Sequence, residues 1–407
     1  MKPSVLDRLF GRRVVVPEAK ASRTGPLIAL QVQGRPVWTG RDLASLAREG
    51  FMKNAVVYRA VTMIAEAAAS VPWLLYEGAD EIAAHPLTDL LAHPNRRQSG
   101  AAFLEALYGN LLVAGNAYAE LVMLGTKPAE LHTLRPDRMK IVPGADGWPE
   151  AYDYAVAGRS VRFPIGDGPS PILHLRLFHP LDDHYGFAPL EAAAIALDIH
   201  NAAGAWNKAL LDNAARPSGA LVYKGEGGGT LSQDQFERLK RELETNYQGA
   251  MNAGRPLLLE GGLDWTAMSL SPHDMDFMEA KNGAAREIAL AFGVPPMLLG
   301  IPGDATYANY QEANRAFWRQ TVLPLVGRTA QALTAWLAPA YGETLRLWYD
   351  ADAVEALSVE RAALWSRVEA AGFLSRDEKR AAVGYGPAGV GGSEGAGEEE
   401  GEGEWTP

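Results

Sequence analysis

The chain has 407 residues, of which 47% are hydrophobic, and its formal net charge is −11. A chain of this length can hold about two or three folding units. The negative balance argues against tight binding to nucleic-acid phosphates as the main activity, because such binding needs clustered lysine and arginine. The sequence contains no cysteine, which excludes disulfides, zinc–thiolate sites and thiol nucleophiles and fits synthesis in the cytosol. No uncharged apolar run is long enough to span a bilayer, so we expect no membrane contact.

The first half of the chain predicts one α+β body. Residues 1–25 are expected to form a mobile arm. Apolar residues at helical spacing predict an amphipathic helix over 54–70 that ends before Pro72, and a second helix that ends at Gly115 and Asn116. Short segments with turn residues between them predict strands at 73–76, 117–123, 130–134, 139–142, 152–156 and 172–178.

Two long helical stretches bracket a small insert in the second half of the chain. The first begins at Pro189 and ends before Pro217, and its apolar stripe consists of Ile195, Ile199, Ala202, Trp206 and Leu210. The second opens at Pro272, and its stripe consists of Met275, Met278, Ala285, Ile288 and Phe292. At 1.5 Å per residue, each arm spans roughly 40 Å. A chain that leaves its body on one long helix and returns on another builds a stalk with a small module at its end, which suits a ring or a channel.

The insert between the two stretches predicts a small α/β module. A strand is expected over 219–224, followed by a flexible glycine-rich turn. Ser232 and Gln235 have the spacing of a capping box, which predicts a helix directly behind them. Two more strands are expected at 256–260 and 265–270.

After the second stretch, the sequence predicts a small polar loop and a long interrupted helix. The loop covers residues 301–306, and the helical pattern runs from 307 to 338 with Pro324 inside it, where a kink or break is expected. A strand over 345–349 and two short helices at 359–371 and 376–383 follow. The last residues are rich in glycine and glutamate, which predicts a disordered acidic tail.

The search for catalytic signatures finds no Walker-type phosphate loop, zinc-protease motif or nucleophile elbow. His179, Asp182, Asp183 and His184 are residue types that can hold a divalent metal, but aspartate and histidine are also common turn formers between a strand and a helix. We favour the turn. The metal interpretation leaves one alternative function open, a soluble metal-dependent hydrolase that uses these four side chains.

Several short runs, in a shared order and spacing over about residues 50–385, resemble the portal proteins of tailed double-stranded DNA phages and related gene-transfer particles. The runs are GNAY at 115–118, GFAPLEAA at 186–193, RPLLLEGG at 255–262, REIA at 286–289, FGVPP at 292–296, LG at 299–300 and YANYQEAN…FWRQTVLP at 307–324.

The resemblance implies a twelve-subunit ring at one capsid vertex of a virion, assembled in the cytoplasm of a host bacterium. Double-stranded DNA enters through its central channel during packaging and leaves through it during delivery. The implied partners are the terminase large subunit, which supplies the ATP hydrolysis, a head–tail adaptor and the major capsid protein. The ring protein itself is expected to be no enzyme and to need neither cofactor nor metal.

The resemblance also implies a division of the chain into named parts. The parts, in chain order, are a wing (26–188 and 339–355), a stem of two helices (189–216 and 272–299), a clip (217–271), a tunnel loop (300–306), a long kinked helix (307–338), a short crown (356–386) and the acidic tail (387–407).

Three sets of side chains are the candidate site residues under this resemblance. The tunnel loop is expected to contact DNA through Pro302, Gly303, Asp304, Ala305 and Thr306. The channel side of the stem is expected to carry Asp274, Asp276, Glu279 and Lys281. The clip is expected to dock terminase and adaptor through Lys224, Glu237, Arg238, Lys240, Arg241 and Glu244.

Overall fold

The structure is a computed structural model. It describes residues 38–78, 80–166, 168–212, 219–223, 263–267, 277–303, 307–341 and 344–385, with the single positions 234, 237, 238 and 241. The predicted arm, most of the clip and the acidic tail lie outside the described residues. In the part that is described, no helix has the length and apolar character needed to cross a membrane.

Two packed helices, α3 (Ala55–Ala69) and α5 (Gly100–Ala114), form the centre of the wing and confirm both predicted helices. The Asn54 side chain caps α3 by accepting hydrogen bonds from the backbone N–H groups of Val56 and Val57. Ser99 caps α5 in the same way, and α5 ends at Gly115, whose φ of 70° suits a residue without a Cβ. Both helices contribute buried apolar side chains to the main core, which includes Val57, Ile64, Phe103, Leu107 and Leu111.

Three small antiparallel sheets complete the wing, and they contain all the strands predicted for it. The first has the order β4-β3-β8, with β3 at Asn116–Leu124, β4 at Lys127–Leu134 and β8 at Ile172–Arg176. The second joins β5 (Met139–Pro143), β6 (Pro149–Val156) and β7 (Arg159–Pro164). The third pairs β1 (Trp73–Glu77) with β11 (Leu345–Tyr349) and the two-residue β2 (Asp80–Glu81), so the chain returns to the wing after the long helix.

A few short elements of the wing were not predicted. α2 (Leu43–Leu46) runs into the π-helical η2 (Ala47–Phe51), α4 (Pro86–Ala92) starts at a proline, and η3 (Pro136–Arg138) is a single 3-10 turn. β7 was also missed, because nearly all of its side chains are exposed and no alternation marks it in the sequence.

The first stem helix is divided into α6 (Pro189–Ala192) and α7 (Ala194–Asp212). The second, α9, covers Phe277–Ala291, which confirms the prediction that this helix ends at the Gly293-Val294-Pro295-Pro296 run. Gly293, with φ 68°, and Pro295 stop the α-helix, and a 3-10 turn, η5 (Pro296–Leu299), follows. In the insert, β9 (Gly219–Tyr223) pairs antiparallel with β10 (Leu263–Ala267), so the strand predicted at 265–270 lies earlier than expected.

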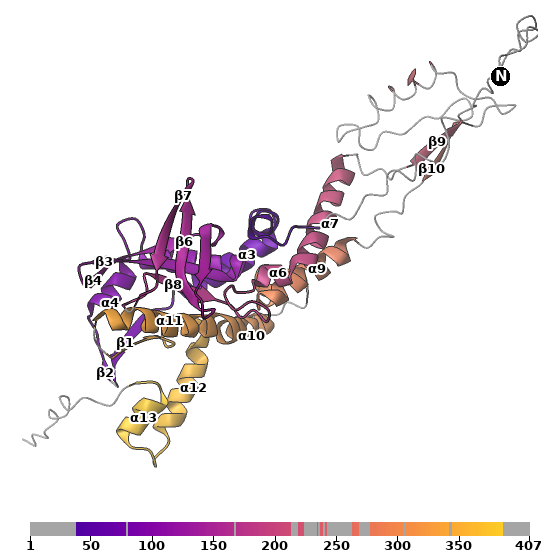
Figure 1. Cartoon of the computed structure of the whole chain (residues 1–407). Helices are drawn as coiled ribbons and strands as arrows, with labels where there is room; N and C mark the ends of the chain where they lie inside the picture. Colours follow the sequence, from indigo (N-terminus) through magenta and orange to yellow (C-terminus); the bar gives the residue numbers. More distant parts are fainter. Residues whose placement is uncertain are drawn as a thin grey trace, which may run out of the picture. The chain divides into compact units, whose positions relative to one another are not determined.

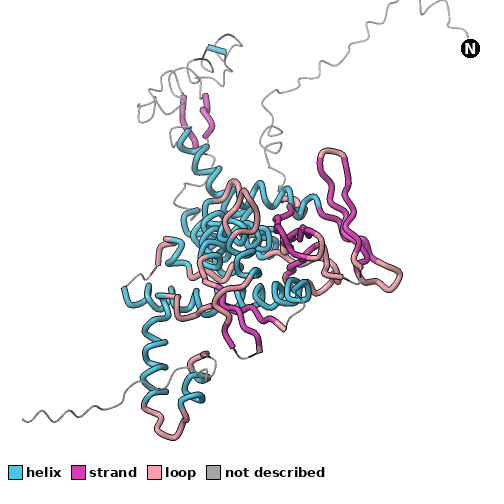
Figure 2. The backbone as a smooth tube through the Cα atoms, turned by 90° about the vertical axis from the view of Figure 1, so that its left-hand side faces the viewer, coloured by secondary structure: helices cyan, strands magenta, loops and turns pink. Residues whose placement is uncertain are grey.

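The long helical pattern is interrupted as predicted. α10 (Tyr307–Phe317) leads into a π-helical segment, η6 (Trp318–Val322), and α11 (Leu323–Tyr341) begins directly before Pro324. Proline has no N–H to donate one turn back, and the wider π-turn accommodates that loss. A 3-10 turn, η7 (Glu355–Leu357), then leads to α12 (Ser358–Glu369) and α13 (Arg376–Ala382), which are the two short helices predicted for the crown (Figure 1). Figure 2 distinguishes these helices from the strands of the wing.

Candidate functional site: the stem helices and the loop that follows them

The two stem helices, α7 and α9, pack against each other (Figure 1). At the end nearest the wing, both join the main apolar core. The α6–α7 segment contributes Leu190, Ala193 and Leu197, and α9 contributes Ala284 and Ile288. The stem is therefore continuous with the core of the wing.

The predicted apolar stripe of α7 lies on the exposed side of the helix. Ile195 is 53% exposed and Ile199 is 43% exposed, and Ala202 is exposed as well. The buried residues Ala196, Leu197 and Ala203 occupy another face of the same helix. Helical spacing thus identified the stripe, of which Ile195, Ile199 and Ala202 are exposed and Trp206 is half-buried.

On α9 the predicted stripe is only partly exposed. Ala285, Ile288 and Phe292 are buried as expected, whereas Met278 is 62% exposed. Leu290, which was not part of the predicted stripe, is 79% exposed. Both stem helices therefore present large apolar side chains to solvent. Leu210 and Met275 lie outside the residues whose side chains are described.

A buried asparagine fixes α7 to the start of α3. The Asn54 amide donates to Asn201 Oδ1 at 2.9 Å and lies 2.9 Å from His200 Nδ1. Asn201 in turn donates to the backbone carbonyl of Glu49 at 2.9 Å. Burial lowers the pKa of His200, and the positive charge of Lys281 on α9 lowers it further. His200 thus has a structural role inside the chain.

Two contacts hold the end of α9 and the start of the tunnel loop. Thr321 Oγ1, on η6, donates to the carbonyl of Gly293 at 2.6 Å. The Arg286 guanidinium donates to the carbonyl of Pro302. Ile301 is buried against Ala285 and Ala289.

Of the predicted tunnel residues, the structure describes Pro302 and Gly303, and both are exposed. Asp304, Ala305 and Thr306 lie outside the described residues. No local pattern singles out Arg286 or Thr321, because each side chain binds a backbone carbonyl that is far away along the chain.

The predicted channel and clip residues are described only in part. Glu279 is exposed, Lys281 is half-buried near His200, and Asp274 and Asp276 are outside the described residues. In the clip, Glu237, Arg238 and Arg241 are helical and exposed, and Arg241 Nε donates to the Glu237 carbonyl at 3.3 Å. The remaining clip candidates, Lys224, Lys240 and Glu244, are outside the described residues.

The loop between β8 and α6 contains the four side chains that suggested a metal site. Asp182 Oδ1 accepts hydrogen bonds from the backbone N–H groups of His184 at 2.7 Å and Tyr185 at 2.9 Å. His179 Nδ1 accepts one from the N–H of Leu181 at 3.0 Å. The side chains stabilise a turn, as the favoured interpretation predicted. No group of three metal-ligating side chains occurs in the described part of the chain, and nothing in the structure supports the hydrolase alternative.

Two of the sequence runs noted above meet in space at the base of this loop. Asn116 Oδ1 accepts a hydrogen bond from the N–H of Gly186 at 2.8 Å, and it lies 3.0 Å from His174 Nε2. Because an amide oxygen can only accept, His174 donates through Nε2. A Cβ added at Gly186 would lie 2.1 Å from the carbonyl oxygen of Gly115, so both glycines permit this close approach.

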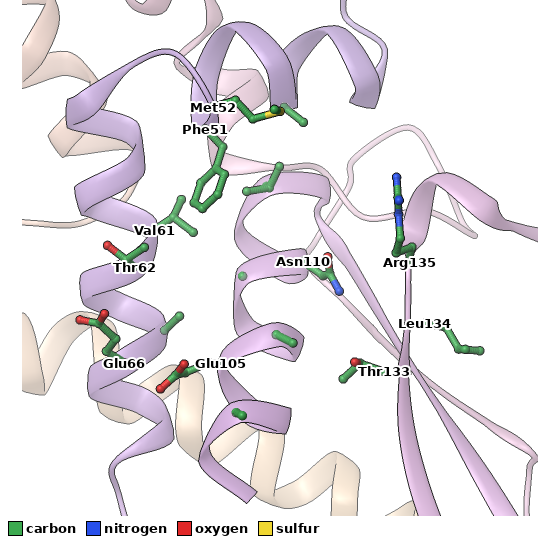
Figure 3. A pocket seen from close by; sticks show the side chains of 16 residues that line it. Phe51, Met52, Val61, Thr62, Glu66, Glu105, Asn110, Thr133, Leu134 and Arg135 are labelled. Atoms are coloured by element: carbon green, nitrogen blue, oxygen red, sulfur yellow. The ribbon is translucent and has the colours of Figure 1, made fainter. Parts of the chain in front are cut away.

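Apart from the stem, the wing contains an open pocket of about 760 Å³ between α3 and α5 (Figure 3). Phe51, Val61 and Val113 give it apolar walls. Its floor includes small residues, and Glu66, Glu105 and Arg135 supply charge.

Comparison with known proteins agrees with this architecture. The family model described as phage portal protein matches residues 55–384. One solved structure is described as the neck of an empty gene transfer agent particle, computed with C6 symmetry. It is 58% identical to this chain, with a TM-score of 0.70, and the match covers 90% of this chain and 100% of that chain. The neck of the native particle, computed with C12 symmetry, is 57% identical, with a TM-score of 0.67 and coverage of 90% and 99%.

A curated relative is similar over nearly the same share of the chain. An uncharacterized protein of Rickettsia bellii (strain RML369-C) is 43% identical over 340 residues, which are 83% of this chain and 88% of the relative. The match to the family model covers most of the described wing, stem, long helix and crown. The chain therefore belongs to the phage portal protein family, in its gene-transfer-agent-like branch.

Proposed function

We propose that twelve copies of this chain form the ring at one capsid vertex of a phage-like particle, and that double-stranded DNA enters and leaves through the channel of that ring. Support for a ring comes from the two neck structures, computed with C6 and C12 symmetry, to which this chain is 57–58% identical. Cyclic rings arise when head-to-tail contacts between identical subunits close on themselves.

The observation that carries this proposal is the exposed apolar face of α7. In a monomer, the exposure of Ile195 and Ile199 to water contributes no stability, whereas smaller alanines fill part of the buried side of the same helix. In a ring of paired helices, this face of one stem meets the exposed face of the next stem, where Leu290 and Met278 project. The stem then encloses the channel.

The charge of the chain fits a channel through which DNA slides. Twelve copies at −11 each carry a formal charge on the order of −130, which disfavours tight binding of phosphates. The tunnel loop, Pro302 to Thr306, is proposed to contact the DNA, with Asp274, Asp276, Glu279 and Lys281 on the channel side of the stem.

The remaining assignments follow the family division. The clip, through Lys224, Glu237, Arg238, Lys240, Arg241 and Glu244, is proposed to dock the terminase large subunit and the head–tail adaptor. The exposed positions of Glu237, Arg238 and Arg241 support this use. The wing is proposed to face the major capsid protein, and the ring is proposed to assemble in the cytoplasm of the host bacterium.

The test compares two substitutions at equally exposed apolar side chains. Ile195 on α7 and Val161 on β7 are each 53% exposed. Ile195→Asp should abolish rings in negative-stain images of the purified full-length chain, because it places an unpaired charge in the subunit contact. Val161→Asp should leave the rings unchanged. Equal ring formation by both variants would show that the α7 face is no subunit contact, and absence of rings from the unsubstituted chain would contradict the ring itself.

A further inference from the structure

The loop between β8 and α6 carries two large apolar side chains that are almost fully exposed. Phe178 is 82% exposed and Leu181 is 91% exposed. We call these two residues the tip. They are three residues apart on one loop, and large apolar side chains exposed close to each other are typical of contact surfaces.

The backbone that carries the tip is held in place from several directions. Its turn is fixed by Asp182 and His179, as described above. Arg176, at the end of β8, donates to the carbonyl of Asp183. At the other end, Asn116 binds the N–H of Gly186. A loop held in this way loses little conformational entropy when its tip is buried by a partner.

The pocket between α3 and α5 has the complementary form. Phe51, Val61 and Val113 line it, while Ala65, Ala102, Ala106 and Gly109 leave space between the two helices (Figure 3). Its volume of about 760 Å³ leaves room for both side chains of the tip. Met52, which also lines the pocket, is 78% exposed and adds apolar surface to it.

The tip and the pocket lie at opposite edges of one sheet. In the order β4-β3-β8, the tip follows the edge strand β8, and the pocket is lined by Thr133 and Leu134 of the other edge strand, β4. Both lie at the same end of the sheet, because Tyr118 of β3 pairs with Leu134 on one side and with His174 on the other. A second copy placed beside the first along the direction of the sheet hydrogen bonds brings the tip of one copy to the pocket of the next.

We infer that the tip of each subunit, Phe178 and Leu181, inserts into the α3–α5 pocket of the neighbouring copy of this chain. This inference rests on the ring proposed above and adds a second, wing-level contact to the stem contact. The contact is heterologous, since a projection at one edge meets a hollow at the other, and such contacts generate rings. Arg176 at the base of the tip is opposite in charge to Glu105 at the pocket, which favours this orientation. The other two charged residues there are already paired, Glu66 with Arg59 and Arg135 with Asp137.

The absence of cysteine from the sequence permits a direct test. Leu181→Cys combined with Ala106→Cys places one thiol on the tip and one in the pocket of every subunit. After mild oxidation of assembled rings, a non-reducing gel should show a ladder of cross-linked species from dimers upward. Each single cysteine variant should stay uncross-linked, and so should the pair of Leu181→Cys with Leu124→Cys, because Leu124 is 79% exposed at the far end of β3.

A second measurement does not depend on disulfide geometry. Leu181→Asp should raise the protein concentration needed for ring assembly roughly tenfold or more, as expected for a buried anchor residue, and Leu124→Asp should leave it unchanged. Rings that form without a ladder and assemble normally with Leu181→Asp would overturn the tip–pocket contact and leave the proposed function intact. Failure of the unsubstituted chain to form rings would instead count against the proposed function.

Discussion

The side-chain oxygen of Asn116 lies 2.8 Å from the backbone nitrogen of Gly186, 70 residues further along the chain. The same asparagine donates to the carbonyls of Ala114 at 2.9 Å and Gly186 at 3.3 Å. These bonds join the end of α5 and the start of β3 to the segment that enters the first stem helix. Two of the sequence runs that resemble portal proteins, at 115–118 and 186–193, are thus the two sides of one junction.

Substituting Gly186 by alanine should destabilise this junction strongly. The added Cβ would lie 2.1 Å from the carbonyl oxygen of Gly115, a backbone atom that cannot move without disturbing the end of α5. We expect a loss of about 2–3 kcal/mol in the free energy of unfolding, measured by urea denaturation. Gly166→Ala is the matched control, because a Cβ there meets nothing within 4 Å, and it should change stability by less than about 0.5 kcal/mol. Equal effects of the two variants would contradict the proposed junction.

The neighbouring His174 predicts a pH dependence of stability. Burial, together with the charges of Arg176 and His184, lowers the pKa of His174 to about 4. The ordinary pKa of histidine, about 6.5, applies in the unfolded chain. Since the folded pKa is depressed, the unfolded chain binds more protons in this range. The contribution of His174 is therefore complete above about pH 6.5 and is lost as the pH falls towards 4.

The measurement compares wild type with His174→Gln, which keeps an N–H donor but has no titration. Between pH 7 and 4 the wild type should lose about 3 kcal/mol more than the variant, an amount that follows from the difference between the two pKa values. Urea unfolding of the non-assembled chain at several pH values measures it. Parallel pH profiles for the two proteins would show that His174 does not titrate in this way.

Many helices and strands could be predicted because their buried side chains recur at the spacing typical of each element. α3 and α5 bury one side at helical spacing, and β1, β3 and β6 have apolar segments between turns, so local sequence predicts them. β7 lacks this signal, since its side chains are exposed on both faces. The end of α9 at Ala291 was predictable too, because a glycine at 293 and prolines at 295 and 296 are strong helix stops.

The candidate site was predictable to a smaller extent. The spacing of Ile195 and Ile199 identified an apolar stripe on α7, but which face of a helix packs within its own chain depends on tertiary contacts. The contacts made by Arg286 and Thr321 could not be predicted, because each side chain binds the backbone of a segment 16 or 28 residues away. No local pattern encodes such a partner.

Thr321 should stabilise the end of the stem through its bond to Gly293. Thr321→Val keeps the shape of the side chain and removes the hydroxyl that donates at 2.6 Å, and we expect a loss of about 1 kcal/mol in the free energy of unfolding. Thr62→Val is the control, because the hydroxyl of Thr62 binds only the carbonyls of its own helix turn, and its loss should cost less. The free energy of unfolding of both variants is measured by urea denaturation. A smaller effect at Thr321 than at Thr62 would show that the contact with Gly293 contributes little.

The Arg286 side chain should determine how firmly the tunnel loop is held. Its guanidinium donates to the carbonyl of Pro302, and a Cβ at Gly303 would lie 2.7 Å from Arg286 Nη2, so the loop packs directly on this side chain. Arg286→Ala should accelerate hydrogen exchange of the amides at Ile301 and Gly303 roughly fivefold, which corresponds to about 1 kcal/mol for one lost hydrogen bond. Arg286→Lys, which keeps a donor, should restore part of the protection. Unchanged exchange in Arg286→Ala would show that the loop is held by other contacts.

Removal of the proposed DNA-contacting residues of the tunnel loop should reduce DNA packaging and leave ring assembly intact. Replacing Pro302–Thr306 by a short glycine–serine linker removes the proposed DNA contact, while Ile301 is retained because it is buried against Ala285 and Ala289. We expect normal rings in negative-stain images and at least a severalfold loss of packaged DNA in particles that contain the variant. A linker of equal length that replaces residues 144–148, the exposed turn between β5 and β6, serves as the control and should package normally. Full packaging by the tunnel variant would show that these residues have no part in moving or retaining DNA.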